Sequence, residues 1–360
     1  MERRTYSKKY KSAEELLAHL ESQGLIIENP DKALEVIKSV GYFHLKGYLA
    51  SLKTGKRFKD GARFESALDL MVWERNLRNL MLAQIGKFEL KLRAAMVDEI
   101  GRGDGLDYLS TEPFEVALSR PTSKNSSETR WTSWRKTLQN LRDDAMVDTD
   151  HVFIGRFLKT YDSDLPLWML IETFSLGQIK TMYEALTVEH KTNVANAFAN
   201  AMYGGNELTA DEFGQFLSII REFRNMASHN NVFWDKKFEL FRASDRTNRR
   251  LKSLPYFSAD LDAFKSTYGI ILALLFLENS WQSDSRWCDE IKLSISALER
   301  IPGIDSKGFG APGNWAAHPA FHDEKSVEQL ETTTSKQERR KKERDRGKAE
   351  AQKFRKKRRS

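Results

Sequence analysis

The sequence predicts an all-α protein, and two observations support this fold class. Apolar residues recur every three or four positions through most of the chain, which is the spacing of one face of a helix. Alternation of apolar and polar residues, the pattern of a half-buried strand, is rare. The 360 residues and 40% hydrophobic content are enough for a large core. We therefore expect an N-terminal helical region at residues 1–62, a multi-helix domain at 63–325 and a basic, disordered tail at 326–360.

The N-terminal helices are predicted from their start and end signals. Residues 12–23 have the pattern of an amphipathic helix, and Gly24 follows as its end signal. A second helix is expected at residues 31–40, because Pro30 suits a helix start and Gly41 suits the position after a helix end.

A long helix is predicted at residues 64–100, with Gly101 after it. Its apolar side consists of Leu70, Trp73, Leu77, Leu80 and Phe88. Residues 119–130 are polar and predict the most mobile internal loop. Beyond it, Trp131 and Trp134 are expected in the core. Periodicity predicts further helices at residues 131–145, 150–160, 166–174, 176–186, 189–203, 258–279 and 284–300.

Composition excludes several kinds of protein. Cys288 is the only cysteine, so no intrachain disulfide and no cysteine-built metal site can form. The longest apolar stretch, Ile270–Leu277, is much shorter than the roughly 20 residues of a membrane-spanning helix. The first residues show no secretory signal, and the histidines show no metal-ligand spacing. We expect a soluble cytoplasmic protein that uses neither a metal nor a cofactor.

The net charge of +7 is concentrated near the C-terminus. Residues 335–360 contain 14 Lys/Arg and 4 Asp/Glu, a net charge of +10, so the rest of the chain carries −3. A segment of this composition cannot bury enough apolar area to fold alone. Two interpretations stay open: the tail attracts nucleic acid by neutralising phosphates, or it only keeps the protein in solution.

The most informative segment begins at Thr209. Thr209 and Glu212 form a capping box, in which both side chains bind free backbone amides at a helix start. The helix is predicted to reach about Asn230. With about 100° between successive residues, Arg224 lies about 20° from Phe213, inside the core-facing stripe. An arginine there needs a partner or a polar crevice, because burying an unpaired charge is costly. The stripe consists of Phe213, Phe216, Leu217, Ile220, Phe223 and Ala227.

A polar strip lies beside this stripe. In order of angle, at about 60°, 80°, 120° and 160°, it contains Ser228, Arg221, Asn225 and His229. Histidine transfers protons near neutral pH, and arginine matches phosphate oxygens. Arg224 and His229, with Asn225 beside them, are therefore a candidate set for cutting RNA without a metal. The imidazole would move protons at the ribose 2′-hydroxyl or the leaving 5′-oxygen, and the guanidinium would hold the charge growing on phosphorus.

Two other interpretations of this strip stay open. An Arg and a His five residues apart are usually a structural pair, and the strip can also hold RNA without cutting it. Geometry is a further difficulty, because Arg224 and His229 lie about 140° apart on one helix. Convergence on one phosphate requires a helix end that unwinds near residues 228–231, or a second copy of the motif facing the first.

Three other features have simpler interpretations. Glu74 with Arg78, and Glu89 with Arg93, have the i,i+4 spacing that is typical of surface ion pairs. His44 is expected to pack against its neighbours more than to contact RNA.

Several motifs follow one another along the chain. An R-N-x-x-x-H motif lies at residues 224–229, within the segment REFRNMASHNNVFW. The other motifs, spread over roughly residues 8–322, are Gly24–Ile27 with Gly41–Tyr48, Phe58–Phe64 with Trp73–Arg78, Leu165–Trp168 with Phe174–Gly177, and Gly308–Trp315. In this order they resemble the Abi-like (AbiD/AbiF) abortive infection family of the HEPN superfamily. The chain departs from the family at Trp73-Glu74, where Phe-Asp is usual, and at His44, where Arg is usual.

This resemblance implies a HEPN-type helical domain and a metal-independent endoribonuclease. Arg224 and His229 would be its catalytic pair, and Asn225 the polar helper. HEPN domains generally pair two such motifs across an interface, so the single motif here implies a homodimer. The resemblance also implies bacterial anti-phage defence, in which the cell's own RNA is cut or translation is stalled. Some relatives act with a small non-coding RNA, so a non-catalytic RNA-binding protein is the alternative.

Overall fold

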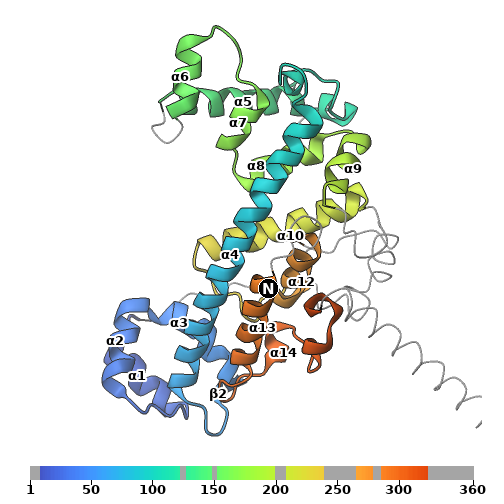
Figure 1. The fold of residues 1–360 in the computed structure, drawn as a ribbon. Coiled ribbons are helices and arrows are strands. Elements are labelled where there is room, and N and C mark those ends of the chain that lie inside the picture. The colour runs from blue at the N-terminus through green and yellow to red at the C-terminus, as the bar shows by residue number, and fades with distance from the viewer. Residues whose placement is uncertain are drawn as a thin grey trace, which may run out of the picture. The chain divides into compact units, whose positions relative to one another are not determined.

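Helices dominate the computed structural model, which describes residues 9–121, 127–147, 152–198, 208–238, 265–278 and 285–322 (Figure 1). The all-α fold class predicted from the sequence is confirmed. The only strands among the described residues are β1 (Lys53–Thr54) and β2 (Arg57–Phe58), which pair antiparallel. The chain divides into two units, residues 1–313 and 314–360. The boundaries predicted after residues 62 and 325 stay predictions, and the basic tail lies outside the described residues.

All of the α-helices among the described residues belong to the first unit. They are α1 (Ala13–Ser22), α2 (Pro30–Val40), α3 (Tyr42–Leu49), α4 (Phe64–Ile100), α5 (Arg130–Val147), α6 (Val152–Thr160), α7 (Leu167–Leu170), α8 (Leu176–Ala185), α9 (Val188–Asn196), α10 (Ala210–Ser228), α12 (Thr267–Glu278), α13 (Ser285–Leu298) and α14 (Ser306–Phe309). Short 3₁₀ helices are η1 (Ala50–Leu52), η2 (Asp107–Leu109), η3 (Val116–Ser119) and η4 (Ile171–Thr173). In the second unit the structure describes η7 (Trp315–Ala317) and η8 (Pro319–Phe321).

The predicted helices agree with these bounds to within a few residues where the structure describes them. The helix predicted at 166–174 is a single turn, α7, that continues as η4. Two of the described α-helices were not predicted, α3 and the short α14. Residues 119–121 and 127–130 of the predicted mobile loop are described, and residues 122–126 lie outside the described part. Parts of the predicted helices at 150–160, 189–203, 258–279 and 284–300 also lie outside it.

The long helix α4 is the element on which most of the first unit is built. It packs against α3, α7, α8, α9, α10, α12 and α13. In Figure 1, α3 lies beside the N-terminal part of α4, and α10 crosses α4 near its middle. Four of the five residues expected on its apolar side are buried, and Leu80 is half-buried. Because helices cover α4 from several directions, polar residues of this helix are buried as well, including Glu74 and Arg78.

Helix α12 explains the longest apolar stretch of the sequence. Every residue from Thr267 to Glu278 is buried, so this helix is covered on all sides and has no solvent-facing polar side. Within the described ranges, no helix combines the length and the apolar character that crossing a membrane requires.

Candidate functional site

Helix α10 forms as its sequence predicts. The backbone amide of Thr209 donates to the Glu212 carboxylate at 2.9 Å, and the amide of Glu212 donates to the Thr209 hydroxyl at 3.3 Å. This capping box satisfies free amides at the helix start. The predicted stripe is buried at every position: Phe213, Phe216, Leu217, Ile220, Phe223 and Ala227. The stripe anchors α10 against α8, α4 and α12 and leaves its polar side accessible.

The helix ends immediately before His229. The amide of Asn231 donates to the Met226 carbonyl at 3.0 Å, and the amide of Asn230 donates to the Ala227 carbonyl at 3.1 Å. Asn230 has φ 54°, a left-handed conformation that asparagine adopts more readily than most residues. These are the hydrogen bonds of a Schellman motif. The chain therefore turns away directly after the imidazole. A helix end within residues 228–231 was one of the two arrangements considered for bringing Arg224 and His229 to one phosphate.

A cleft of about 490 Å³ lies along the polar side of α10, next to α8. Its lining residues are Lys180, Ser218, Arg221, Glu222, Asn225, Met226, His229 and Asn231. Lys180 is paired with Glu184, and Arg221 has no polar partner among the described residues. The cleft thus combines the Arg221 cation, an imidazole and amides, which are groups that bind phosphate oxygens and base edges, with the carboxylate of Glu222.

Gly177 on α8 permits the close approach of Arg221 to the cleft wall. A Cβ at position 177 would lie only 3.1 Å from Nε of Arg221. A side chain there would require the guanidinium to move by a few tenths of an ångström. The glycine of the Phe174–Gly177 motif therefore has a steric role beside the cleft.

Arg224 lies outside this cleft. Its Nε lies 3.4 Å from Oε1 of Glu89 on α4, and the two side chains are 36% and 13% exposed. Glu89 also lies 4.0 Å from Nη2 of Arg93. The terminal nitrogens of Arg224 have no partner among the described residues, so they can still bind a phosphate. The structure thus brings His229 and Asn225 into one cleft and places Arg224 beside a carboxylate.

The interpretation of the two i,i+4 pairs as surface ion pairs was wrong. The side chains of Glu74 and Arg78 are only 0% and 8% exposed, with Nη2 of Arg78 2.9 Å from Oε1 of Glu74. Glu89 and Arg93 are 13% and 18% exposed. Spacing along one helix cannot reveal burial by other helices, so the sequence carried no signal that distinguishes these pairs from exposed ones.

Glu74 holds the chain that follows His229. Its Oε2 accepts hydrogen bonds from the backbone amides of Phe233 at 2.8 Å and Trp234 at 2.7 Å. Its partner Arg78 donates to the backbone carbonyl of Asn231 at 2.9 Å. A buried ion pair on α4 therefore determines the path of residues 231–234, and with it the position of the end of α10.

Other elements close around the same segment. The Tyr48 hydroxyl on α3 donates to Oε1 of Glu74 at 2.7 Å. A Cβ at Gly47 would lie 2.9 Å from a Val232 methyl, and a Cβ at Gly308 would lie 2.5 Å from the Trp234 ring. Motifs that are far apart in the sequence thus meet at the residues that follow the R-N-x-x-x-H motif.

Burial shifts the pKa values of this cluster. Burial raises the pKa of Glu74, and the hydrogen bonds from Phe233, Tyr48 and Trp234 and the charge of Arg78 oppose that shift. Burial and the charge of Glu74 raise the pKa of Tyr48, so its phenol stays a neutral donor. Burial and Arg78 lower the pKa of His44. The His44 ring packs edge-on against Tyr48, in agreement with the packing role expected for it.

In the part of the chain that the structure describes, no group of three or more His, Cys, Asp or Glu residues could hold a metal ion.

The fold and the site define a class of all-α proteins. In this class a polar cleft lies at the end of a helix that packs on the core, and a buried ion pair positions that helix end. The chain belongs to the Abi-like protein family, whose model matches residues 35–235. The matched range includes α4, α10 and every residue of the cleft. This membership confirms the resemblance to the Abi-like family and suggests a role in abortive infection, whereas the HEPN-type assignment stays a prediction. No curated protein and no solved structure matches the chain.

Proposed function

We propose that this protein acts on RNA during abortive infection and cuts it as an endoribonuclease, through His229, Asn225 and Arg224. The observation that best supports the proposal is the cleft at the end of α10, where His229 and Asn225 lie beside Arg221. A cation attracts the RNA backbone, and an imidazole beside it can move protons near neutral pH.

The reaction would use the RNA's own 2′-hydroxyl. The 2′-oxygen attacks phosphorus while the bond from phosphorus to the 5′-oxygen breaks, leaving a 2′,3′-cyclic phosphate and a 5′-hydroxyl. A base takes the 2′-hydroxyl proton and an acid gives a proton to the leaving oxygen; imidazole serves either role. The terminal nitrogens of Arg224 would stabilise the charge on the phosphoryl oxygens. DNA lacks the 2′-hydroxyl and would not be cut.

A homodimer would complete this site. Within one protomer Arg224 contacts Glu89 while His229 lines the cleft, so the pair does not meet on one phosphate. Arg221, Ser228 and His229 are exposed, and a second copy can cover them. Two-fold symmetry would then place Arg224 of one protomer near the partner's His229.

The test is RNA cutting by the full-length protein in the presence of a chelator. We expect products with 2′,3′-cyclic phosphate ends, and loss of cutting in Arg224→Ala and His229→Ala. Lys159→Ala, an exposed cation on α6, is the control and should cut normally. Mixing the two inactive variants should restore part of the activity if the site is composite. Normal cutting by both variants would reject the proposal.

A second candidate function is RNA binding without cutting, within a complex with a small non-coding RNA. The contact of Arg224 with Glu89 favours it, because the cleft then has an imidazole and a cation but lacks the second member of the motif. In this case Arg221→Ala would weaken RNA binding and no condition would give cleavage. Deleting residues 335–360 separates the contribution of the basic tail from that of the cleft.

A further inference from the structure

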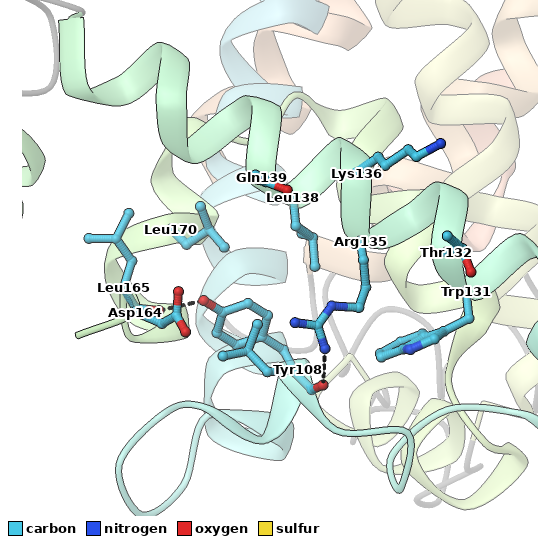
Figure 2. A pocket seen from close by; sticks show the side chains of 11 residues that line it. Tyr108, Trp131, Thr132, Arg135, Lys136, Leu138, Gln139, Asp164, Leu165 and Leu170 are labelled. Atoms are coloured by element: carbon cyan, nitrogen blue, oxygen red, sulfur yellow. Dashed lines mark hydrogen bonds between the residues drawn. The ribbon is translucent and has the colours of Figure 1, made fainter. Parts of the chain in front are cut away.

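A second pocket lies between α5, η2 and the chain that leads into α7, and it shares no residue with the cleft of α10 (Figure 2). Its volume is about 490 Å³. This is within the roughly 300–1,000 Å³ typical of small-molecule sites. Its lining includes Tyr108, Trp131, Arg135, Leu138, Gln139 and Leu165. We call this site the Trp131 pocket.

The floor of the Trp131 pocket is apolar and rigid. Leu138, Leu165 and Leu170 are buried beneath it. Tyr108 is also buried, and its hydroxyl donates to the Leu165 carbonyl at 2.6 Å, which fixes the ring as a wall. A flat, weakly polar ring can displace water from such a floor without leaving a buried polar group unpaired.

One guanidinium points into the Trp131 pocket, between Trp131 and Tyr108 (Figure 2). The Arg135 guanidinium lies 6.0 Å from the centroid of the Trp131 ring, and its Nη1 donates to the Leu109 carbonyl at 3.0 Å. Trp131 was expected in the core, but this residue is only half-buried, and it packs on Phe114. A guanidinium held by an aromatic ring and one hydrogen bond keeps other donors for an anion and needs little further ordering to bind it.

The rim of the Trp131 pocket indicates how much charge it can accept. Lys136 is paired with Glu128 at 2.7 Å, and Figure 2 shows it pointing away from Arg135. Arg135 is therefore the cation available to a ligand in this pocket. Gln139 is exposed at the rim and carries an amide group that matches the edges of a nucleobase. The single cation can bind one phosphate, the apolar floor can hold a planar base, and the polar rim can bind the edge of that base.

We propose that the Trp131 pocket binds one nucleotide, with its base against the apolar floor and its phosphate on Arg135. The same chemistry is present in a free mononucleotide and in a nucleotide of a single-stranded RNA. In the second case the pocket is a contact for RNA away from the cutting site, and that form of the inference rests on the proposed function.

The test titrates the full-length protein, freed of co-purified nucleic acid, by calorimetry with the four 5′-mononucleotides and with a short single-stranded RNA. The RNA titrations use the His229→Ala background, so that the strand stays intact. Removing a charged hydrogen-bond partner should weaken binding roughly 10-fold or more in Arg135→Gln. Arg135→Lys keeps the charge without the planar fork and should restore only part of the affinity.

Two further variants keep the test decisive. Gln139→Trp places a large side chain at an exposed rim position and should weaken binding without disturbing the core. Arg156→Gln removes an exposed cation of α6 that does not line the Trp131 pocket, and should bind normally. Thermal unfolding of each variant identifies those that fold.

The outcomes separate the two ligands and the two proposals. If the wild type binds mononucleotides and Arg135→Gln does not, the pocket is a site for free nucleotides. If the wild type binds RNA but no mononucleotide, and Arg135→Gln weakens the binding of RNA, the pocket is a contact for RNA. The inference is overturned if the wild type binds neither ligand at millimolar concentration, or if Arg135→Gln and Gln139→Trp bind as tightly as the wild type. Nucleotide binding without RNA cutting would reject the proposed function and leave this inference standing.

Discussion

The Nε atom of Arg224 lies 3.4 Å from Oε1 of Glu89, and this contact joins α10 to α4 beside the candidate site. It uses the inner nitrogen of the guanidinium and leaves the two outer nitrogens to other partners. A contact of this kind orients an arginine without occupying the pair of donors that binds a phosphate. We therefore regard Glu89 as a positioning residue for Arg224.

Replacing Glu89 should lower cutting while leaving RNA binding nearly intact. In Glu89→Gln the guanidinium loses its charged partner, and we expect cutting to fall about 3- to 10-fold, a barrier change of roughly 1 kcal/mol. The measurement is the single-turnover rate of RNA cutting. The matched control is Glu172→Gln, which removes a carboxylate that lies 3.9 Å from Arg93. Faster cutting by Glu89→Gln would show instead that the carboxylate holds Arg224 away from RNA.

The second prediction concerns the buried pair of Glu74 and Arg78. Glu74→Gln leaves the buried guanidinium of Arg78 without its charged partner. The NH₂ group of the new amide would also face hydrogen-bond donors that now point at the carboxylate of Glu74. We expect the free energy of unfolding to fall by about 3–5 kcal/mol, measured by urea denaturation. Asp98→Asn, at an exposed i,i+4 pair with Arg102, should change it by less than about 1 kcal/mol. Equal effects of the two variants would contradict the structural role assigned to Glu74.

The third prediction concerns the turn after His229. Asn230 has φ 54°, so a β-branched side chain there is strained. Asn230→Val should destabilise the protein by roughly 1–2 kcal/mol and reduce cutting, because the helix end moves. Asn230→Gly should be nearly neutral in both measurements, since glycine adopts this conformation freely. A stable and fully active valine variant would mean that the turn does not position His229.

The fourth prediction is a pH dependence of stability that comes from His44, whose pKa is lowered by burial and by Arg78. Below its ordinary pKa of about 6.5, histidine takes up a proton more readily in the unfolded chain than in the folded one. The contribution of His44 to the free energy of unfolding is therefore present above this pH and lost as the pH falls below it. His44→Gln should reduce this slope. Identical pH profiles of the variant and the wild type, measured by urea denaturation, would reject the assignment.

Hydrophobic periodicity and capping signals by themselves determined most of the helical elements. Both ends of α4 were predicted to the residue, and the capping box of Thr209 and Glu212 located the start of α10. These features depend on groups within a few residues of one another, so local sequence is sufficient. Helix α3 was missed because aromatic residues and Gly47 dominate its sequence, and its buried side chains face α4. The motifs also led to the correct family.

Tertiary structure alone decided which polar residues share an environment. On one helix, spacing determines only that Arg224 and His229 point in different directions. It was α8 that formed a cleft with His229 and Asn225, and α4 that supplied Glu89 for Arg224. The burial of Glu74 likewise depends on α3 and on the chain after α10, which are far from it in sequence. Helix formation is local, whereas the surroundings of a side chain depend on the elements that pack against it.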